Sequence, residues 1–431
     1  MVYTKQNFYF PLKVLLAFNI FTLIVFEFGS IDWQLSGFSH FLLILYLGTN
    51  LCALYLGYKR ALKNYKIKKL YGNIFDNNRK KIYFIIFVAI LWMLPLMTLR
   101  LGLTVVNPTD IANKLVEGLI NPTKGYFEKF EAIKMTSKEN RTLLRAVNFF
   151  FTPVMYAFFI WGFLYFKRLK FWRFFVLILF VLEILSWIAI GTNKGVVDLA
   201  FIMFFLFYYL KPEFFKIELK KLILGVAILS TIFLYFLNNT STRHIGDKST
   251  SYLSDLDLTI LDNPIKDDGL YKDISIETKF SSVMLAAYLA QGYYCLALSF
   301  EAPTTWTYGL GNSWFGVEVY RTLTGGDLIR QTYLGYLSDT YNIDPEIYWH
   351  TIYLWLANDF TFYGVPFIVF AIGYGLGLSW MDMIYKRTVY AAPAFCLFAL
   401  MVFYFYANNQ IISFSTLPFI VFVLLWIIKR R

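Results

Sequence analysis

The sequence predicts an all-α polytopic membrane protein with about ten transmembrane helices. Hydrophobic residues make up 58% of its 431 residues and charged residues 16%, whereas soluble domains average about 45–50% apolar and about 25% charged. Lysine and arginine concentrate in the short segments between apolar runs. The formal charge of +12 therefore indicates a positive-inside topology in a lipid bilayer and not nucleic-acid binding.

The expected spans follow from a window of about 20 mostly apolar residues. They lie at about 12–29, 38–58, 82–100, 149–166, 173–190, 195–210, 221–238, 358–380, 389–406 and 411–428. The connection at 59–81 is rich in lysine and arginine and contains one acid, Asp76. Such a segment stays in the cytoplasm. Counting spans from it places every other basic connection, and both termini, on the cytoplasmic side.

The spans divide the chain into three parts. Residues 1–237 contain helices 1–7 and an outer loop at 101–148, residues 238–354 form a large outer loop, and residues 355–431 contain helices 8–10. An apolar helix near 281–300 interrupts the large loop. Counting it as an eleventh span would place the C-terminal basic residues outside, so we expect it to lie at the surface or to re-enter the membrane.

The two outer loops differ in local pattern. Apolar residues in Asp110–Lys138 have helical spacing, which predicts a surface helix. The first half of the large loop is rich in Ser, Thr, Asn, Asp and Gly, which predicts turns and irregular structure.

Lys194 lies in the turn Gly191-Thr192-Asn193-Lys194-Gly195 between the fifth and sixth spans. A cation on the less basic side, beside a glycine turn, suits a lipid phosphate or diphosphate. The alternative is a lysine that extends to lipid head groups without a specific ligand. The spacing is not that of a P-loop.

Two further basic groups lie in the large outer loop. Arg243 and His244 follow the seventh span, where arginine matches phosphate oxygens and histidine accepts a proton near neutral pH. Arg321 and Arg330 flank Asp327 beside a segment rich in glycine and aromatic residues. Aromatic faces suit sugar rings, but they equally suit an interfacial aromatic belt.

His350 and Asp359 lie at the entrance to the eighth span. An ionisable residue at the edge of a membrane is a functional candidate. Alternatively, Asp359 stabilises the positive end of a helix dipole. His40 is expected to be structural. The spacing of histidine and cysteine residues predicts no metal site, and no cofactor is expected.

The segment 348–377, YWHTIYLWLANDFTFYGVPFIVFAIGYGLG, resembles a late segment of the bacterial O-antigen polymerases (oligosaccharide repeat unit polymerases). Phe26-Glu27-Phe28-Gly29 before Trp33 also looks like this family, as does the long loop after the seventh span. The arginine-to-glycine spacing that some members carry in their outer loops does not follow Arg243, Arg321 or Arg330.

The resemblance implies a fold like that of the type C glycosyltransferases, in the bacterial inner membrane with the site facing the periplasm. It implies polymerisation of undecaprenyl-diphosphate-linked repeat units into O-antigen or a related polysaccharide, without a metal. The partners would be the lipid-linked glycan donor and acceptor, with a chain-length regulator and a flippase as further candidates. Lys194, Arg243, Arg321 and Arg330 would hold the diphosphate, and His350, His244 or Asp359 would act as the catalytic base.

Three alternatives stay open. An O-antigen ligase would use the same donor but transfer the glycan to lipid A core. A transporter or flippase of lipid-linked sugar would have repeats, broken helices and short loops. A membrane scaffold would have no catalytic residues.

Overall fold

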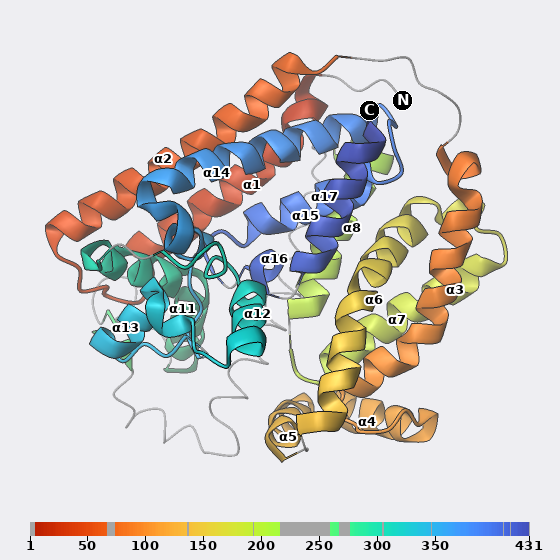
Figure 1. Cartoon of the computed structure of the whole chain (residues 1–431), viewed down its shortest axis with the longest axis horizontal. Helices are drawn as coiled ribbons and strands as arrows, with labels where there is room; N and C mark the ends of the chain where they lie inside the picture. The colour runs from red at the N-terminus through yellow and green to blue at the C-terminus, as the bar shows by residue number, and fades with distance from the viewer. Residues whose placement is uncertain are drawn as a thin grey trace. The chain divides into compact units, whose positions relative to one another are not determined.

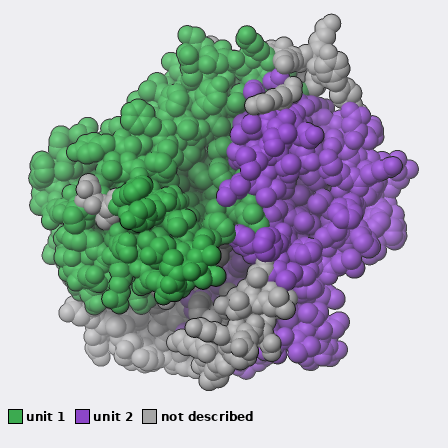
Figure 2. Space-filling view, in the orientation of Figure 1, with its two compact units in different colours: residues 1–69, 249–385, 394–419 green, residues 70–248, 386–393, 420–431 purple. Residues whose placement is uncertain are grey.

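The computed structural model of the chain describes residues 5–66, 74–135, 138–192, 194–215, 259–266, 276–303, 306–345, 347–407, 409–413 and 415–430. They form two compact units, coloured separately in Figure 2. Unit 1 comprises 1–69, 249–385 and 394–419, and unit 2 comprises 70–248, 386–393 and 420–431.

The described chain is almost entirely helical (Figure 1), which confirms the predicted all-α class. Within the described ranges, seven helices are long and apolar enough to cross a membrane: Gln6–Phe28, Gly37–Asn64, Ile74–Arg100, Val147–Leu164, Trp172–Ala189, Thr278–Glu301 and Ile352–Ile384. The chain is therefore a multi-pass membrane protein.

Six of the expected spans fall on these long helices, and the remainder differ. The span at 195–210 is a helix of 17 residues, and that at 221–238 lies outside the described residues. The span expected at 389–406 ends as a helix at Phe403, and 411–428 is divided between two helices. The helix near 281–300 is also long enough to span. Length and composition therefore do not separate a span from a re-entrant helix there, and the basic connections favour the second.

Unit 1 is built on four long helices. Its elements are α1 (Lys5–Phe28), α2 (Gly37–Asn64), β1 (Thr259–Ile260), β2 (Asn263–Pro264), α11 (Ile276–Leu298), η4 (Ser299–Glu301), α12 (Trp314–Thr324), η5 (Ile329–Gln331), α13 (Tyr333–Tyr341), α14 (Ile352–Ile384), most of α15 (Ala391–Phe403), α16 (Gln410–Ser413) and the start of α17 (Thr416–Arg430). α14 lies along α2, as Figure 1 shows, and α11 packs against α1.

Glycine allows α2 and α14 to approach closely. A Cβ atom on Gly57 would lie 2.0 Å from the carbonyl oxygen of Phe370, and one on Gly373 would lie 2.3 Å from that of Leu54. Small residues are the usual means of close helix packing in membranes, because water does not drive association there.

The short β-hairpin of unit 1 falls in the loop half that was predicted to be rich in turns. β1 and β2 pair antiparallel across Leu261 and Asp262, both with positive φ. Backbone hydrogen bonds from Asp32 to Pro264 (2.9 Å) and from Lys266 to Ser30 (2.9 Å) attach the hairpin to the α1–α2 connection.

Unit 2 contains α3 (Ile74–Arg100), α4 (Pro108–Ile120), α5 (Pro122–Met135), α6 (Lys138–Leu164), η1 (Phe166–Arg168), α7 (Trp172–Ala189), α8 (Lys194–Leu210) and η2 (Pro212–Phe215), with the end of α17. The single surface helix expected at 110–138 is in fact two helices, which was an error of the sequence interpretation. Asn121 ends α4, and Pro122 begins α5 because proline lacks the N–H that a continuing helix requires.

Candidate functional site

The strongest site candidate in unit 2 is a buried ion pair between α3 and α7. The Nη2 atom of Arg100 lies 2.8 Å from Oε1 of Glu183, and each side chain is 9% exposed. Arg100 also donates through Nη1 to the hydroxyl of Ser186. Its guanidinium carbon lies 4.1 Å from the ring centroid of Trp187, whose indole N–H donates to Glu183 Oε1 at 2.8 Å. We call Arg100, Glu183, Ser186 and Trp187 the Arg100 cluster.

The cluster is held in a fixed geometry but retains binding capacity. Two N–H groups of Arg100 donate to described residues, out of the five that a guanidinium carries. Oε2 of Glu183 is buried and has no hydrogen-bond partner among the described residues. Buried ionisable groups at membrane depth are costly and usually functional.

Lys194 begins α8 and is electrostatically coupled to the Arg100 cluster. Burial lowers the pKa of the Lys194 ammonium to about 8; the Asp198 carboxylate opposes this shift and the charge of Arg100 adds to it. The structure therefore brings a predicted cation, Lys194, together with one that the sequence interpretation did not select.

The two described glycines of the Lys194 turn have separate structural reasons. Gly191 has a φ of +60°, a left-handed conformation that favours glycine. Gly195 lies so close to Trp187 that a Cβ atom there would come within 2.0 Å of the indole ring. The motif thus places the first turn of α8 directly on the Arg100 cluster.

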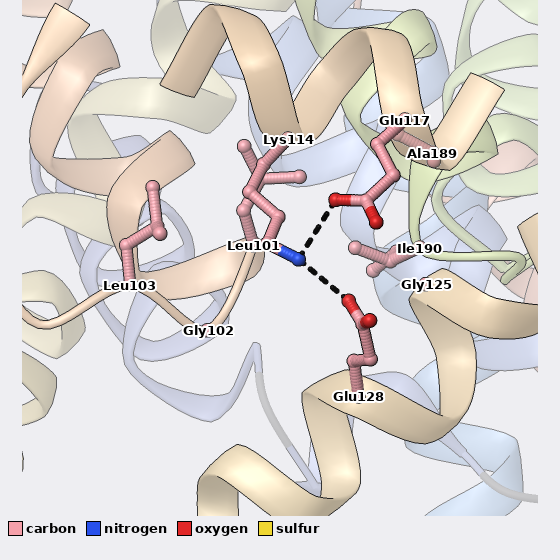
Figure 3. Close-up of a pocket in the computed structure, with 10 residues that line it drawn as sticks. Leu101, Gly102, Leu103, Lys114, Glu117, Gly125, Glu128, Ala189 and Ile190 are labelled. Atoms are coloured by element: carbon pink, nitrogen blue, oxygen red, sulfur yellow. Dashed lines mark hydrogen bonds and ion pairs between the residues drawn. The ribbon is translucent and has the colours of Figure 1, made fainter. Parts of the chain in front are cut away.

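A pocket of about 270 Å³ lies beside the same helix ends (Figure 3). Its lining includes Leu101, one residue after Arg100, and Ala189 and Ile190 at the end of α7. Lys114 of α4 contributes a central cation, 2.9 Å from Glu117 and 2.6 Å from Glu128.

A second lysine, Lys124, pairs with the same two glutamates. Lys124 lies 2.6 Å from Glu117 and 3.5 Å from Glu128. Its hydrogen bond, followed by that of Lys114, lowers the pKa of Glu117 to about 2. All four side chains are more than a third exposed, so water screens them and each pair adds little stability.

In unit 1, Asn358 and Asp359 of α14 hold two other segments of the unit, 307–312 and the start of α13. Asp359 accepts four hydrogen bonds: from the N–H (3.0 Å) and hydroxyl (2.8 Å) of Thr307, from the N–H of Gly309 (2.8 Å), and from the side chain of Asn312 (3.2 Å). Asn358 is fully buried, donating to Gly311 O at 2.7 Å and accepting from Tyr333 N at 2.9 Å.

The anchored segment presents two aromatic rings to the surroundings. Trp306 and Tyr308 are 66% and 68% exposed, with ring centroids 4.7 Å apart.

Two residues after Asp359, Thr361 has φ 56° and ψ 163° and interrupts α14. A β-branched residue in this region stores strain, which is commonest at functional sites.

The other sequence candidates of unit 1 lie in different settings. Arg321 is 2.7 Å from Glu318 and 4.0 Å from Asp327, while the more exposed Arg330 is 3.7 Å from Asp327. The structure thus brings both arginines to one carboxylate, which partly neutralises them.

The two histidines of unit 1 have opposite environments. His350 is 2% exposed, neither ring nitrogen has a hydrogen-bond partner among the described residues, and burial lowers its pKa to about 3. It is therefore neutral at pH 7. His40 pairs with Glu27 at 2.8 Å, in the Phe-Glu-Phe-Gly motif, which fits the structural role expected for it.

Two of the residues predicted from the sequence, Arg243 and His244, lie outside the described residues. Among the residues that the structure describes, no group of three or more His, Cys, Asp or Glu side chains could hold a metal ion.

Sequence reasoning missed Arg100 and Glu183 because each looked like part of a span. The available signal was Glu183, a lone acid inside the apolar run at 173–190, since such an acid needs a partner. Its spacing to Trp187 is one helical turn, which places both on one face.

No family model, curated protein or solved structure matches the chain. The interpretation of the site therefore rests on its geometry and on the sequence resemblance.

Proposed function

We propose that the chain is a membrane glycosyltransferase that polymerises undecaprenyl-diphosphate-linked repeat units into a surface polysaccharide, at the outer face of the bacterial inner membrane. The observation that supports this proposal is the position of Lys194 beside the Arg100 cluster, because Gly195 packs on Trp187 and the charge of Arg100 acts on the Lys194 ammonium. The positive-inside pattern of the sequence predicts that this end faces outward.

The chemistry explains why cations are needed. The acceptor hydroxyl oxygen forms a bond to the anomeric carbon of the donor, and the bond from that carbon to the diphosphate oxygen breaks. The hydroxyl proton passes to a base, and undecaprenyl diphosphate leaves with the negative charge. Arg100 and Lys194 are suited to stabilise that charge, because a guanidinium fork matches phosphate oxygens and a poorly hydrated site strengthens the attraction.

Unit 1 separately contains residues of the kinds that bind sugars and accept protons. The exposed rings of Trp306 and Tyr308 suit a sugar face, and Asp359 holds their segment in place. Asp359 is the candidate base among the described residues, since it is partly exposed whereas His350 is enclosed and neutral. Arg321, Arg330 and Arg243 remain candidates for binding the diphosphate. His244 remains a candidate for the base.

A transporter of lipid-linked sugar is the second candidate, because two apolar segments are interrupted. α14 breaks at Thr361, and described residues 404–407 and 409, between α15 and α16, are not helical. Broken helices are a feature of transporters. An O-antigen ligase shares the donor chemistry and is the nearest alternative enzyme.

The test is the glycan ladder of a strain that lacks its own polymerase and carries this chain or a variant. Lys194→Ala is compared with Lys211→Ala, an exposed lysine just beyond the other end of α8, with the membrane abundance of each protein measured. We expect the parent and Lys211→Ala to restore the ladder and Lys194→Ala to leave a single-repeat band. Arg243→Ala and His350→Ala test the remaining assignments in the same strain.

The outcomes separate the candidate functions. Normal ladders from every variant would refute the site assignment. Loss of all repeats from lipid A core in a deletion strain would indicate a ligase. Accumulation of lipid-linked repeats on the cytoplasmic face would indicate a transporter.

A further inference from the structure

The apolar surface of helix α4 is wider than the face by which the helix packs against the rest of unit 2. Ile111, Leu115 and Gly118 are buried and share one face, and α4 packs against α7. At 3.6 residues per turn, the apolar surface continues beyond this face through Leu119, Val116 and Ile120.

The additional apolar face is exposed. Ile120 is 81%, Val116 58% and Leu119 36% exposed. Together with the buried face it gives an apolar arc of roughly 200°, whereas a helix that packs on a protein core and faces water needs a stripe of about 100°. The polar residues Asp110, Asn113, Lys114 and Glu117 occupy the remaining side of the helix.

Lipid is the occupant that fits this face, because the exposed arc lies next to surfaces that face lipid. α3 carries exposed apolar side chains along its length, among them Phe84, Phe87 and Leu91. α4 begins eight residues after α3 ends, and the connection between them exposes Val105 and Val106. The apolar surface therefore continues from a spanning helix onto α4.

We infer that α4 lies in the plane of the membrane interface, with Val116, Leu119 and Ile120 in the acyl region of the bilayer. The opposite side of the helix contributes Lys114 and Glu117 to the 270 Å³ pocket. One helix thus has lipid on one side and the pocket on the other, which places the pocket at the level of the lipid head groups. This inference requires a bilayer but not the proposed transferase activity.

Two glycines make the placement of α4 and α5 rigid. A Cβ atom on Gly118 would lie 2.3 Å from the carbonyl oxygen of Ala189, and one on Gly125 would lie 2.2 Å from it. Both helices therefore sit directly on the end of α7. A rigid attachment to a spanning helix holds the depth of α4 in the membrane.

The test uses single cysteines labelled with bimane in the full chain, reconstituted in phosphatidylcholine nanodiscs. Cys52 is exposed and is replaced by alanine, while Cys295 and Cys396 are buried and must remain unlabelled in that background. Val116→Cys and Ile120→Cys report on the apolar face. Asp110→Cys, an exposed position of α4, is the matched control on the polar side, and Leu91→Cys is the control for a spanning helix.

Quenching by lipids brominated on the acyl chains is compared with quenching by aqueous iodide. We expect labels at 116, 120 and 91 to be quenched several-fold more by brominated lipid than the label at 110, and iodide to give the reverse order. If iodide quenches positions 116 and 120 as strongly as 110, the helix faces water and the inference is wrong. Protection from both quenchers would mean that protein covers the face, for example a second copy, and would equally overturn it.

Discussion

The Glu183→Leu substitution leaves the guanidinium of Arg100 inside unit 2 without its carboxylate partner. The pair is 2.8 Å apart and both side chains are 9% exposed, so water cannot replace the lost partner. Removing one member of a buried ion pair costs about 3–5 kcal/mol. Trp187 also loses the acceptor of its indole N–H, so we expect a loss at the upper end of that range.

The double variant Arg100→Met/Glu183→Leu distinguishes the pair from general packing. With both charges removed there is no unpaired charge, and replacing a buried pair by apolar residues is often neutral or stabilising. We therefore expect the double variant to regain most of the stability that either single variant loses. If the pair belongs to the site, the double variant will be stable but will not restore a glycan ladder.

The assay is equilibrium unfolding of the purified full chain in mixed micelles, in a double-mutant cycle. Glu213→Leu, at an exposed position in η2, is the control for a change of net charge. The reasoning fails if Glu183→Leu costs less than about 1 kcal/mol, the value of an exposed pair, or if the two single losses simply add in the double variant.

Three other predictions follow from the packing and the charges. Asp359→Leu removes the acceptor of four hydrogen bonds and should lower the free energy of unfolding by about 2–4 kcal/mol. Protease cleavage within 306–313 should accelerate, and Asp359→Asn should have the smaller effect. Gly195→Ala places a Cβ atom 2.0 Å from Trp187 and should destabilise by about 1–3 kcal/mol, whereas Gly48→Ala, with open space around it, should be neutral in the same thermal assay. The pKa of Glu117 is lowered from 4.5 to about 2 by Lys124 and Lys114, so its contribution is complete above pH 4.5 and disappears as the pH falls through about 2. The hydrogen-exchange protection of α4 and α5, relative to the intrinsic rate at each pH, should therefore be unchanged from neutral pH down to that window, and a loss of protection that begins near neutral pH would contradict the assignment.

The sequence alone determined the class of the protein, because hydropathy is a local property. The long apolar runs within the described residues are mainly helical, and the helix expected at 281–300 is α11. The helix ends were less predictable: α3 begins at Ile74, before the expected 82, because helical hydrogen bonds continue beyond the apolar window into polar residues.

The tertiary structure decided which residues meet. Lys194 was visible as an unusual cation, but its coupling to Arg100 depends on how α3, α7 and α8 pack. Asp359 was visible as an acid at the membrane entrance, but its four bonds to residues 307–312 required the folded loop. Arg100 and Glu183 are 83 residues apart in the chain, and no periodicity in one helix indicates its partner in another. Pairing of charges inside the membrane is determined by helix packing, whereas the helices themselves are determined by the apolar residues that keep them there.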